Sequence, residues 1–291
     1  MKDLTLVLPA YNEEGALPEI LPELLKFSDE KGCQLVIVND GSKDRTREIL
    51  DGFVKHPALT VVHHKVNRGY GGALKSGIRS AKTTYVMTID ADGQHKLQDV
   101  EKLYHLIREK DADMIVGSRP DKGQHWYRSL GKFLIRNFAR LLLPLTIRDI
   151  NSGMKVYDTE LAQKYINLCP DHMAFSDIIT LVFLSHRHLV LEEPIEINPR
   201  ASGVSTINTM TAIDTVREIV NIVILFNPMR IFIPVATFLL GFGIIWVAPF
   251  MIRGEGVSTG GMLLIVSGLL FFSLGLLAEQ LSTIRKSLIP R

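Results

Sequence analysis

The chain has 291 residues, of which 46% are hydrophobic, and its 33 basic and 31 acidic side chains give a formal net charge of +2. A chain of this length accommodates one large globular domain and a further segment, and its near-neutral charge excludes nucleic-acid binding through bulk electrostatic attraction. The two cysteines, Cys33 and Cys169, lie far apart without disulfide or metal-knuckle spacing, which is typical of a reducing compartment.

The N-terminal part of the chain alternates short apolar runs with stretches of helical periodicity. The runs predict strands over 4–9, 34–39, 59–63, 85–89 and 114–117, and the stretches between them predict helices over 16–28, 46–55 and 71–80. The first run is followed at once by the polar sequence YNEE (11–14), without a cleavage pattern, so it predicts a strand and not a signal peptide. This alternation is typical of a parallel sheet covered by helices, in which ligands bind beyond the carboxyl ends of the strands.

Acidic side chains follow three of the predicted strands, in the sequences PAYNEE (9–14), NDGS (39–42) and DADGQH (90–95). Asp90 and Asp92, with the amide of Gln94, offer the oxygen ligands that suit Mg²⁺ or Mn²⁺ bridging phosphate oxygens. Asp40, at a neighbouring strand end, is available for a nucleoside. A solvated turn is the common explanation of an isolated Asp-x-Asp, but the strand over 85–89 delivers this one to the ligand-binding edge, which favours a metal site.

The glycine-rich segment NRGYGGALKSG (67–77) is a candidate for binding phosphates. It is not a P-loop, because Leu74 stands before Lys75 where that motif requires glycine. Its glycines would still allow the backbone to approach a ligand at the start of a helix, whose N-terminus favours anions. A plain glycine-rich turn is the alternative.

Basic residues recur every four positions at Arg128, Lys132, Arg136 and Arg140, which places them on one helix face. A solvated charged face is one explanation. We favour an amphipathic helix that lies on anionic headgroups or holds a lipid phosphate, because long apolar segments follow in the same chain. The stretch 209–225 is a second candidate for a membrane-surface helix.

Two segments near the C-terminus, 231–252 and 256–278, contain no charged residue. Each exceeds the roughly 20 residues that cross a bilayer core, so the pair predicts a transmembrane hairpin, with two buried helices of a soluble core as the alternative. Basic residues gather outside the hairpin, whereas its inner loop holds Arg253 offset by Glu255. The positive-inside rule therefore predicts a multi-pass protein of the cytoplasmic membrane, with the N-terminal domain and both chain ends in the cytoplasm.

Six motifs occur in order along the chain: PAYNE (9–13), VNDGSKDRT (38–46), NRG (67–69), DADGQH (90–95), GSR (117–119) and DINSGMK (149–155). With these motifs the chain resembles the polyprenyl-phosphate glycosyltransferases of glycosyltransferase family 2, of the dolichyl-phosphate mannose synthase type. The two-span tail is similar to the membrane-anchored bacterial and archaeal branch. The resemblance implies an α/β domain of the Rossmann-like glycosyltransferase A type, followed by a two-helix transmembrane hairpin. We expect a catalytic domain over 1–207, a juxtamembrane amphipathic helix over 208–228, the two spans over 229–280 and a cytoplasmic tail over 281–291.

The resemblance also implies roles for individual residues. The expected donor-binding residues, with Lys75 taken from the glycine-rich segment, are Pro9, Tyr11, Glu13, Asp40, Lys75, Asp90 and Arg200. The expected metal ligands are Asp90, Asp92 and Gln94. The acceptor phosphate is expected at Ser118, Arg119, Arg128 and Lys132, although relatives commonly carry a small hydroxyl at the position of Lys132. The expected catalytic residues are Asp92, Arg128 and Asp149, of which Asp149 would orient the acceptor or aid proton transfer.

The implied reaction is the inverting transfer of a hexose-type sugar from a UDP- or GDP-linked donor to undecaprenyl or dolichyl phosphate on the cytoplasmic leaflet. A phosphate acceptor needs no strong general base, because its second pKa is about 6 and it is largely dianionic at neutral pH. One alternative is a processive polysaccharide synthase, but QHWYR (124–128) does not match the QxxRW motif and only two spans are predicted. A second alternative is a membrane-tethered nucleotide-sugar sensor without activity, against which Asp90 and Asp92 argue. The sequence leaves open whether the protein forms a homo-oligomer.

Overall fold

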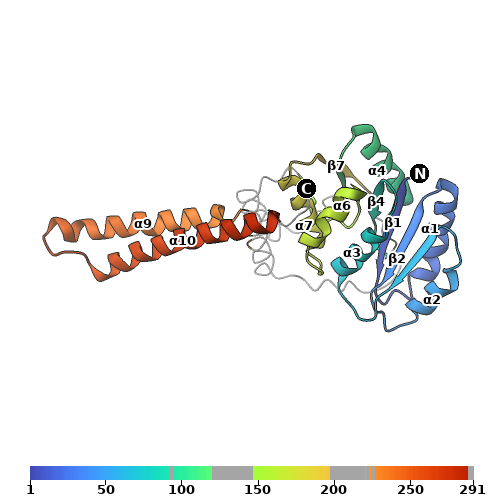
Figure 1. Ribbon diagram of the computed structural model, residues 1–291, viewed down its shortest axis with the longest axis horizontal. Helices are drawn as coiled ribbons and strands as arrows, with labels where there is room; N and C mark the ends of the chain where they lie inside the picture. The colour runs from blue at the N-terminus through green and yellow to red at the C-terminus, as the bar shows by residue number, and fades with distance from the viewer. Residues whose placement is uncertain are drawn as a thin grey trace. The chain divides into compact units, whose positions relative to one another are not determined.

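A computed structural model of the protein describes residues 1–91, 93, 95–119, 147–196, 220, 223–224 and 227–287. The chain forms two compact units (Figure 1), one made of residues 1–123 and 146–208 and the other of residues 124–145 and 209–291. The predicted basic helix around Arg128–Arg140 and most of the predicted surface helix over 209–225 lie outside the described residues.

The first unit is built on a seven-stranded sheet in the order β3-β2-β1-β4-β6-β5-β7. Its strands are β1 (Leu4–Ala10), β2 (Gln34–Asn39), β3 (Leu59–His63), β4 (Tyr85–Thr88), β5 (Met114–Ser118), β6 (Lys155–Asp158) and β7 (Val190–Pro194). All neighbouring pairs are parallel except those of β6, which runs antiparallel to β4 and β5. The expectation of a parallel sheet is therefore wrong at β6. The chain enters β6 from the edge where β4 and β5 end, so it can only run back between them.

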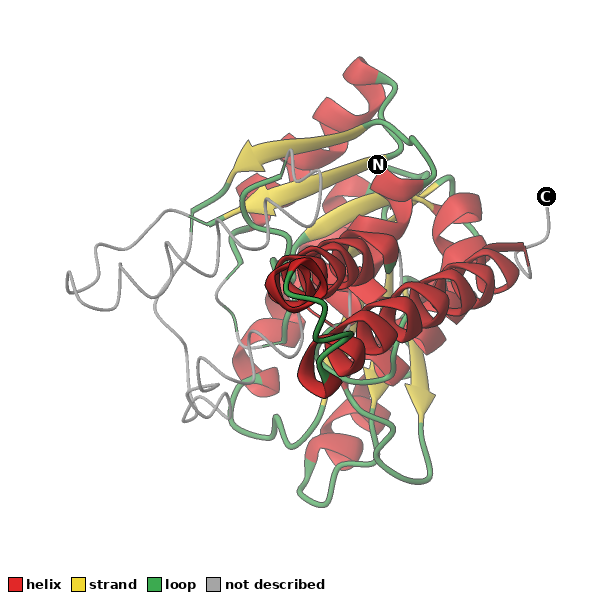
Figure 2. Ribbon diagram, turned by 90° about the vertical axis from the view of Figure 1, so that its left-hand side faces the viewer, coloured by secondary structure: helices red, strands yellow, loops and turns green. Residues whose placement is uncertain are grey.

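Helices cover both faces of this sheet (Figure 2). The described helices of the unit are α1 (Leu17–Lys31), α2 (Thr46–Phe53), α3 (Tyr70–Ser80), α4 (Leu97–Lys110), α6 (Thr159–Tyr165) and α7 (Phe175–Ser185), with a 3₁₀ turn, η1 (Ile166–Leu168). Side chains alternate along a strand, so Leu6 and Leu8 of β1 pack in one core with α1 and α4. Val7 faces α3, where a Cβ on Gly77 would lie 2.2 Å from its Cγ1 atom. Glycine is thus required for α3 to pack this closely on the sheet.

The second unit contains two long apolar helices, α9 (Met229–Ile252) and α10 (Thr259–Ser287). Gly261, Gly268 and Gly275 recur every seven residues along α10, and a Cβ on each would lie within 2.7 Å of a side chain of α9. Small residues at this spacing let two membrane helices approach closely. The second helix begins at Thr259 and not at residue 256, because Gly254 and Gly256 take positive φ angles of 75° and 81° in the turn.

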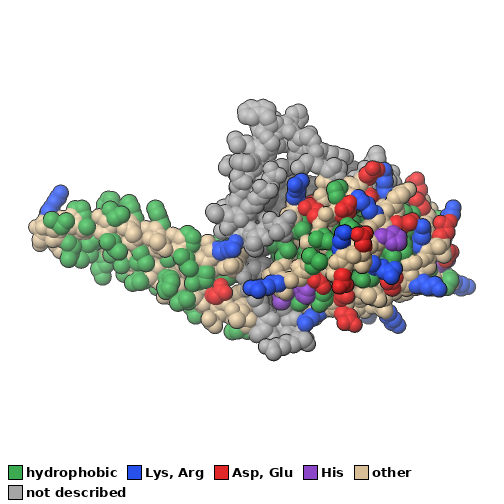
Figure 3. Space-filling view, turned by 90° about the horizontal axis from the view of Figure 1, so that it is seen from above, with side chains coloured by type: hydrophobic (Ala, Val, Ile, Leu, Met, Phe, Trp, Pro, Cys, Tyr) green, Lys and Arg blue, Asp and Glu red, His purple; other side chains and the backbone are tan. Residues whose placement is uncertain are grey.

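The outside of this helical pair is hydrophobic, with charged side chains only near its ends on the face shown in Figure 3. Each helix has a mean hydropathy of 2.3 over its most apolar window, of which only 17% is buried. A core helix of a soluble domain would instead be largely buried. The two helices are consistent with the predicted transmembrane hairpin.

Candidate functional site

The carboxyl ends of β1, β2 and β4 bring the first three acidic motifs to one edge of the sheet. Two loops there are joined by hydrogen bonds: the Asn12 backbone N–H donates to Ser42 Oγ at 3.0 Å, and the Glu13 backbone N–H donates to Thr46 Oγ1 at 2.8 Å. Asn12 takes a positive φ of 56° in this turn. Next to it, Tyr11 is 42% exposed, which leaves its ring accessible for a ligand to stack upon.

Asp40 lies at the end of β2 with its side chain almost entirely buried. Its carboxylate accepts hydrogen bonds from the backbone N–H groups of Arg68 at 2.9 Å and Gly69 at 2.8 Å, and lies 2.6 Å from His64 Nδ1. His64 Nε2 in turn lies 2.8 Å from Ser76 Oγ on α3. Asp40 therefore fixes the start of the glycine-rich segment, while its predicted contact with a nucleoside stays a prediction.

The glycines before and within α3 make room for the protein's own backbone. A Cβ on Gly69 would lie 2.5 Å from the carbonyl oxygen of Asp171, and one on Gly71 would lie 2.4 Å from that of Pro170. The Gly72 N–H donates to the Asp171 carbonyl at 3.0 Å, and Lys75 Nζ donates to the Asp171 carboxylate at 2.5 Å. These glycines therefore make room for the neighbouring loop at the start of α3, and the phosphate-binding role of the segment stays a prediction. The role of Lys75 toward the donor stays a prediction.

Asp90 follows β4 and is held from two sides. Tyr70 Oη donates to Oδ1 at 3.0 Å, and His95 Nε2 lies 3.3 Å from Oδ2. Burial opposes its ionisation, but the hydrogen bonds from His95 and Tyr70 and the charge of Arg119 outweigh burial and lower the pKa of Asp90 below its usual value. The carboxylate is thus an ionised group whose side chain is 35% exposed.

Only one of the three predicted metal ligands falls within the described residues, because Asp92 and Gln94 lie outside them. Within the part of the chain that the structure describes, no group of three or more His, Cys, Asp or Glu side chains is arranged to hold a metal ion. Asp90 fits the predicted role by its chemistry, since an ionised carboxylate is a ligand that Mg²⁺ and Mn²⁺ prefer.

Arg119 and Asp149 form a two-pronged ion pair beside this site. Arg119 Nε donates to Oδ2 at 2.7 Å and Nη2 donates to Oδ1 at 2.8 Å, and the Arg119 backbone N–H adds a third bond at 3.1 Å. Burial raises the pKa of the Asp149 carboxyl, but the bonds and charge of Arg119 outweigh it, so the pKa is lowered. Ser118, at the end of β5, lies next to this pair, whereas Arg128, Lys132 and Arg200 lie outside the described residues.

The loop over 149–154 connects this ion pair to Asp90. A Cβ on Gly153 would lie 2.4 Å from Asp90 Oδ2, so the carboxylate rests directly on the loop backbone. Thr88 Oγ1 donates to the Gly153 carbonyl at 2.7 Å, which ties the loop to β4. The structure thus brings Asp90, Arg119 and Asp149 together. Sequence reasoning missed Tyr70 and His95 as partners of Asp90, although both stand inside quoted motifs.

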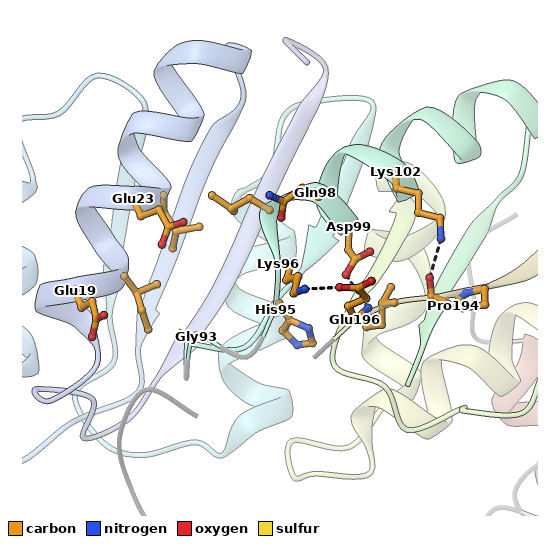
Figure 4. A pocket seen from close by; sticks show the side chains of 14 residues that line it. Glu19, Glu23, Gly93, His95, Lys96, Gln98, Asp99, Lys102, Pro194 and Glu196 are labelled. Carbon is orange, nitrogen blue, oxygen red and sulfur yellow. Dashed lines mark hydrogen bonds and ion pairs between the residues drawn. The ribbon is translucent and has the colours of Figure 1, made fainter. Parts of the chain in front are cut away.

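A cavity of about 1000 Å³ lies beside Gly93 between α1 and α4, lined by Glu19 and Glu23 of α1 and by His95, Lys96 and Glu196 among others. Figure 4 shows Lys96 and Glu196 pointing toward one another, and they form an ion pair. Of the predicted donor-binding and acceptor-binding residues that the structure describes, none lines this cavity.

The mixed sheet, with an acidic motif at the end of β4, defines a glycosyltransferase A-type domain, and it is accompanied by two apolar helices. Residues 5–166 match the family described as Glycosyl transferase family 2, and residues 227–284 match the GtrB C-terminal hairpin. The protein belongs to glycosyl transferase family 2.

Several proteins are similar to the chain. A dolichyl-phosphate beta-glucosyltransferase from Dictyostelium discoideum is 30% identical over 181 residues, which cover 55% of this chain and 55% of that enzyme. An undecaprenyl-phosphate 4-deoxy-4-formamido-L-arabinose transferase from Edwardsiella ictaluri is 27% identical, with 97% of this chain and 89% of that enzyme covered. The match thus spans about half of the first enzyme and most of the second.

The fold is also similar to that of glucosyl-3-phosphoglycerate synthase from Mycobacterium tuberculosis, solved with Mn²⁺, UDP-glucose and phosphoglyceric acid. The two structures have a TM-score of 0.57 at 15% sequence identity, covering 76% of this chain and 79% of the other. At this level of identity the likeness concerns the fold alone.

Proposed function

We propose that the protein is a membrane-anchored glycosyltransferase that moves a hexose-type sugar from a nucleotide-diphosphate sugar to a polyprenyl phosphate, with inversion at the anomeric carbon. The observation that carries this proposal is that one chain joins a family 2 domain to a hairpin of the GtrB type. The acceptor class is supported by the names of the two similar transferases, which specify dolichyl phosphate and undecaprenyl phosphate.

The described residues of the site can position anions. Arg119 would meet the acceptor phosphate, and Asp149, which orients the Arg119 guanidinium, is a weak base because its pKa is lowered. A phosphate monoester has a second pKa of about 6, so at neutral pH its oxygen attacks the anomeric carbon without a general base. As that bond forms, the bond to the donor diphosphate breaks and the nucleoside diphosphate leaves.

A divalent cation, Mg²⁺ or Mn²⁺, is proposed at Asp90, Asp92 and Gln94, where it would offset the charge that develops on the departing diphosphate. Tyr70 and His95 hold the Asp90 carboxylate in one orientation. The proposed donor contacts are Pro9, Tyr11, Glu13, Asp40, Lys75, Asp90 and Arg200. The proposed acceptor contacts are Ser118, Arg119, Arg128 and Lys132.

We also propose that residues 1–207 form a catalytic domain on the cytoplasmic face of the cell membrane, joined through 208–228 to the two spans over 229–280 and a cytoplasmic tail over 281–291. The two apolar helices and the basic residues outside them support this orientation. The lipid-linked sugar would then form on the cytoplasmic leaflet.

The test is a transfer assay with the full chain in lipid nanodiscs. Radiolabelled UDP- and GDP-sugars are offered one at a time with undecaprenyl or dolichyl phosphate, and organic-phase radioactivity is measured, with polyprenol lacking the phosphate as the control acceptor. We expect label in the lipid phase with the phosphate and none with the alcohol. Label in a growing polymer would favour a processive synthase, and no transfer from any donor would favour a binding protein. Either result would overturn the proposal.

A further inference from the structure

Lys155, the first residue of β6, is a lysine with no exposed surface. Its ammonium donates to the backbone carbonyl of Ile150 at 2.7 Å and to that of Ser176. The ammonium group of Lys155 therefore donates these hydrogen bonds to two segments of the main chain and not to a carboxylate.

This arrangement is costly for folding. The pKa of Lys155 is lowered from 10.5 to about 7, because burial outweighs the charges of Asp177 of α7 and Asp149 of the loop, which raise it. An apolar side chain of similar length would avoid the desolvation of an ammonium group, and such replacements are often neutral or stabilising. Fold stability alone does not explain a lysine at this position.

The two carbonyls belong to segments that reach the candidate site from different directions. Ile150 directly follows Asp149, whose carboxylate holds Arg119, and it lies in the loop whose Gly153 supports Asp90. Ser176 is the second residue of α7, and its side chain lies close enough to Tyr70 to affect the pKa of the Tyr70 hydroxyl, which burial and Asp90 raise. Tyr70 in turn donates to Asp90 at 3.0 Å. Lys155 thus contacts both the loop that carries Asp149 of the ion pair and the start of α7, which lies beside Tyr70, the partner of Asp90.

We propose that Lys155 is a positioning residue for sugar transfer, whose hydrogen bonds to Ile150 and Ser176 set the Arg119–Asp149 pair relative to Asp90. The inference rests on the proposed function, since Arg119 is expected at the acceptor and Asp90 at the donor. Without these bonds the loop over 149–153 and the start of α7 would shift independently. Reacting groups misplaced by about 1 Å lose roughly 10²-fold in rate.

The experiment compares the full chain in nanodiscs carrying Lys155→Met, which removes the donors, or Lys155→Gln, which keeps an NH₂ donor without the charge. Lys82→Met is the matched control, because Lys82 is exposed and precedes β4. The measurements are kcat, the KM for each substrate, the stoichiometry of nucleoside diphosphate binding and the melting temperature. The wild type and Lys82→Met also test the proposed function, because both must transfer sugar to the lipid phosphate.

We expect Lys155→Met to lower kcat 30- to 100-fold, with an unchanged donor KM, full nucleotide stoichiometry and a melting temperature at or above that of the wild type. Lys155→Gln should recover at least a third of the wild-type kcat. With an active wild type, a Lys155→Met kcat within threefold of normal would overturn the inference. So would a Gln variant no better than Met, or a loss of nucleotide stoichiometry that matches the loss of rate. If the wild type itself is inactive, the proposed function fails instead.

Discussion

Gly153→Ala places one methyl group against the carboxylate that is expected to bind the metal. The added Cβ would lie 2.4 Å from Asp90 Oδ2 and 2.8 Å from both Cγ and Oδ1. Ordinary contact begins at 3.4 Å, so the carboxylate or the loop must move by about 1 Å. Gly153 has no positive φ, so backbone strain adds nothing to the effect. A shift of about 1 Å at a reacting centre costs roughly 10²-fold in rate, and overpacking costs about 1–3 kcal/mol of stability.

The assay is polyprenyl-phosphate transfer at varied Mg²⁺ or Mn²⁺ concentration, with the melting temperature recorded for each variant. Gly52→Ala is the matched control, because nothing lies within 4 Å of the Cβ it adds on α2. We expect Gly153→Ala to lower kcat about 100-fold and to raise the metal concentration for half activity, while Gly52→Ala retains normal transfer. Normal kcat and metal dependence in folded Gly153→Ala protein would refute the reasoning that Asp90 is held in place by the loop.

Four further outcomes follow from the structure. Arg119→Ala should lower kcat/KM for the lipid phosphate at least tenfold while nucleoside diphosphate affinity, measured by calorimetry, stays normal; equal losses on both substrates would contradict its assignment. Because the pKa of Asp149 is lowered, the stability that its ionised carboxylate adds is present above its usual pKa of 3.8 and is lost only as pH falls through the lowered pKa. Asp149 therefore does not titrate between pH 5 and 8, and the pH–rate profiles of the wild type and of Asp149→Asn should have the same shape over that range. Gly268→Leu should lower the melting temperature of the full chain in detergent, because a Cβ there lies 2.7 Å from Leu240, whereas Gly241→Leu meets open space and should not. Chelation with EDTA should abolish transfer and added Mg²⁺ or Mn²⁺ should restore it; transfer that survives chelation would contradict the proposed metal site.

Strands with apolar runs could be predicted from the sequence, whereas β6 could not. The runs at 34–39 and 59–63 coincide with β2 and β3, and residues 35–38 of β2 are continuously apolar because that part of the strand is buried. The strand β3 lies at the edge of the sheet and is partly exposed. The strand β6 has only the four residues KVYD, and two of them are charged. Its lysine is buried with its ammonium group hydrogen-bonded to the carbonyls of Ile150 and Ser176, and the alternation of polar and apolar residues does not reveal these bonds.

From the sequence, the site could be predicted only where its residues stand next to one another along the chain. Asp90 was found because an acidic motif follows an apolar run, but its partner Tyr70 comes from a segment interpreted as a phosphate cradle. The glycines of that segment are required by the loop at Asp171, which lies about a hundred residues further along the chain. The pairing of Arg119 with Asp149 also depends on how β5 and the loop before β6 meet. Composition identifies such residues, but their partners follow from the topology.

The charged groups of this site are arranged to stay charged, and this bears on the kind of catalysis they can perform. Asp90 and Asp149 both have lowered pKa values, the one through His95, Tyr70 and Arg119 and the other through Arg119. A general base needs a pKa near the working pH, so neither carboxylate suits that role. An acceptor that already carries its charge needs positioning against a donor of the same sign, which fixed ion pairs provide. The loop over 149–154 touches both carboxylates, so a change in this loop should alter the rate of transfer before it alters the binding of either substrate.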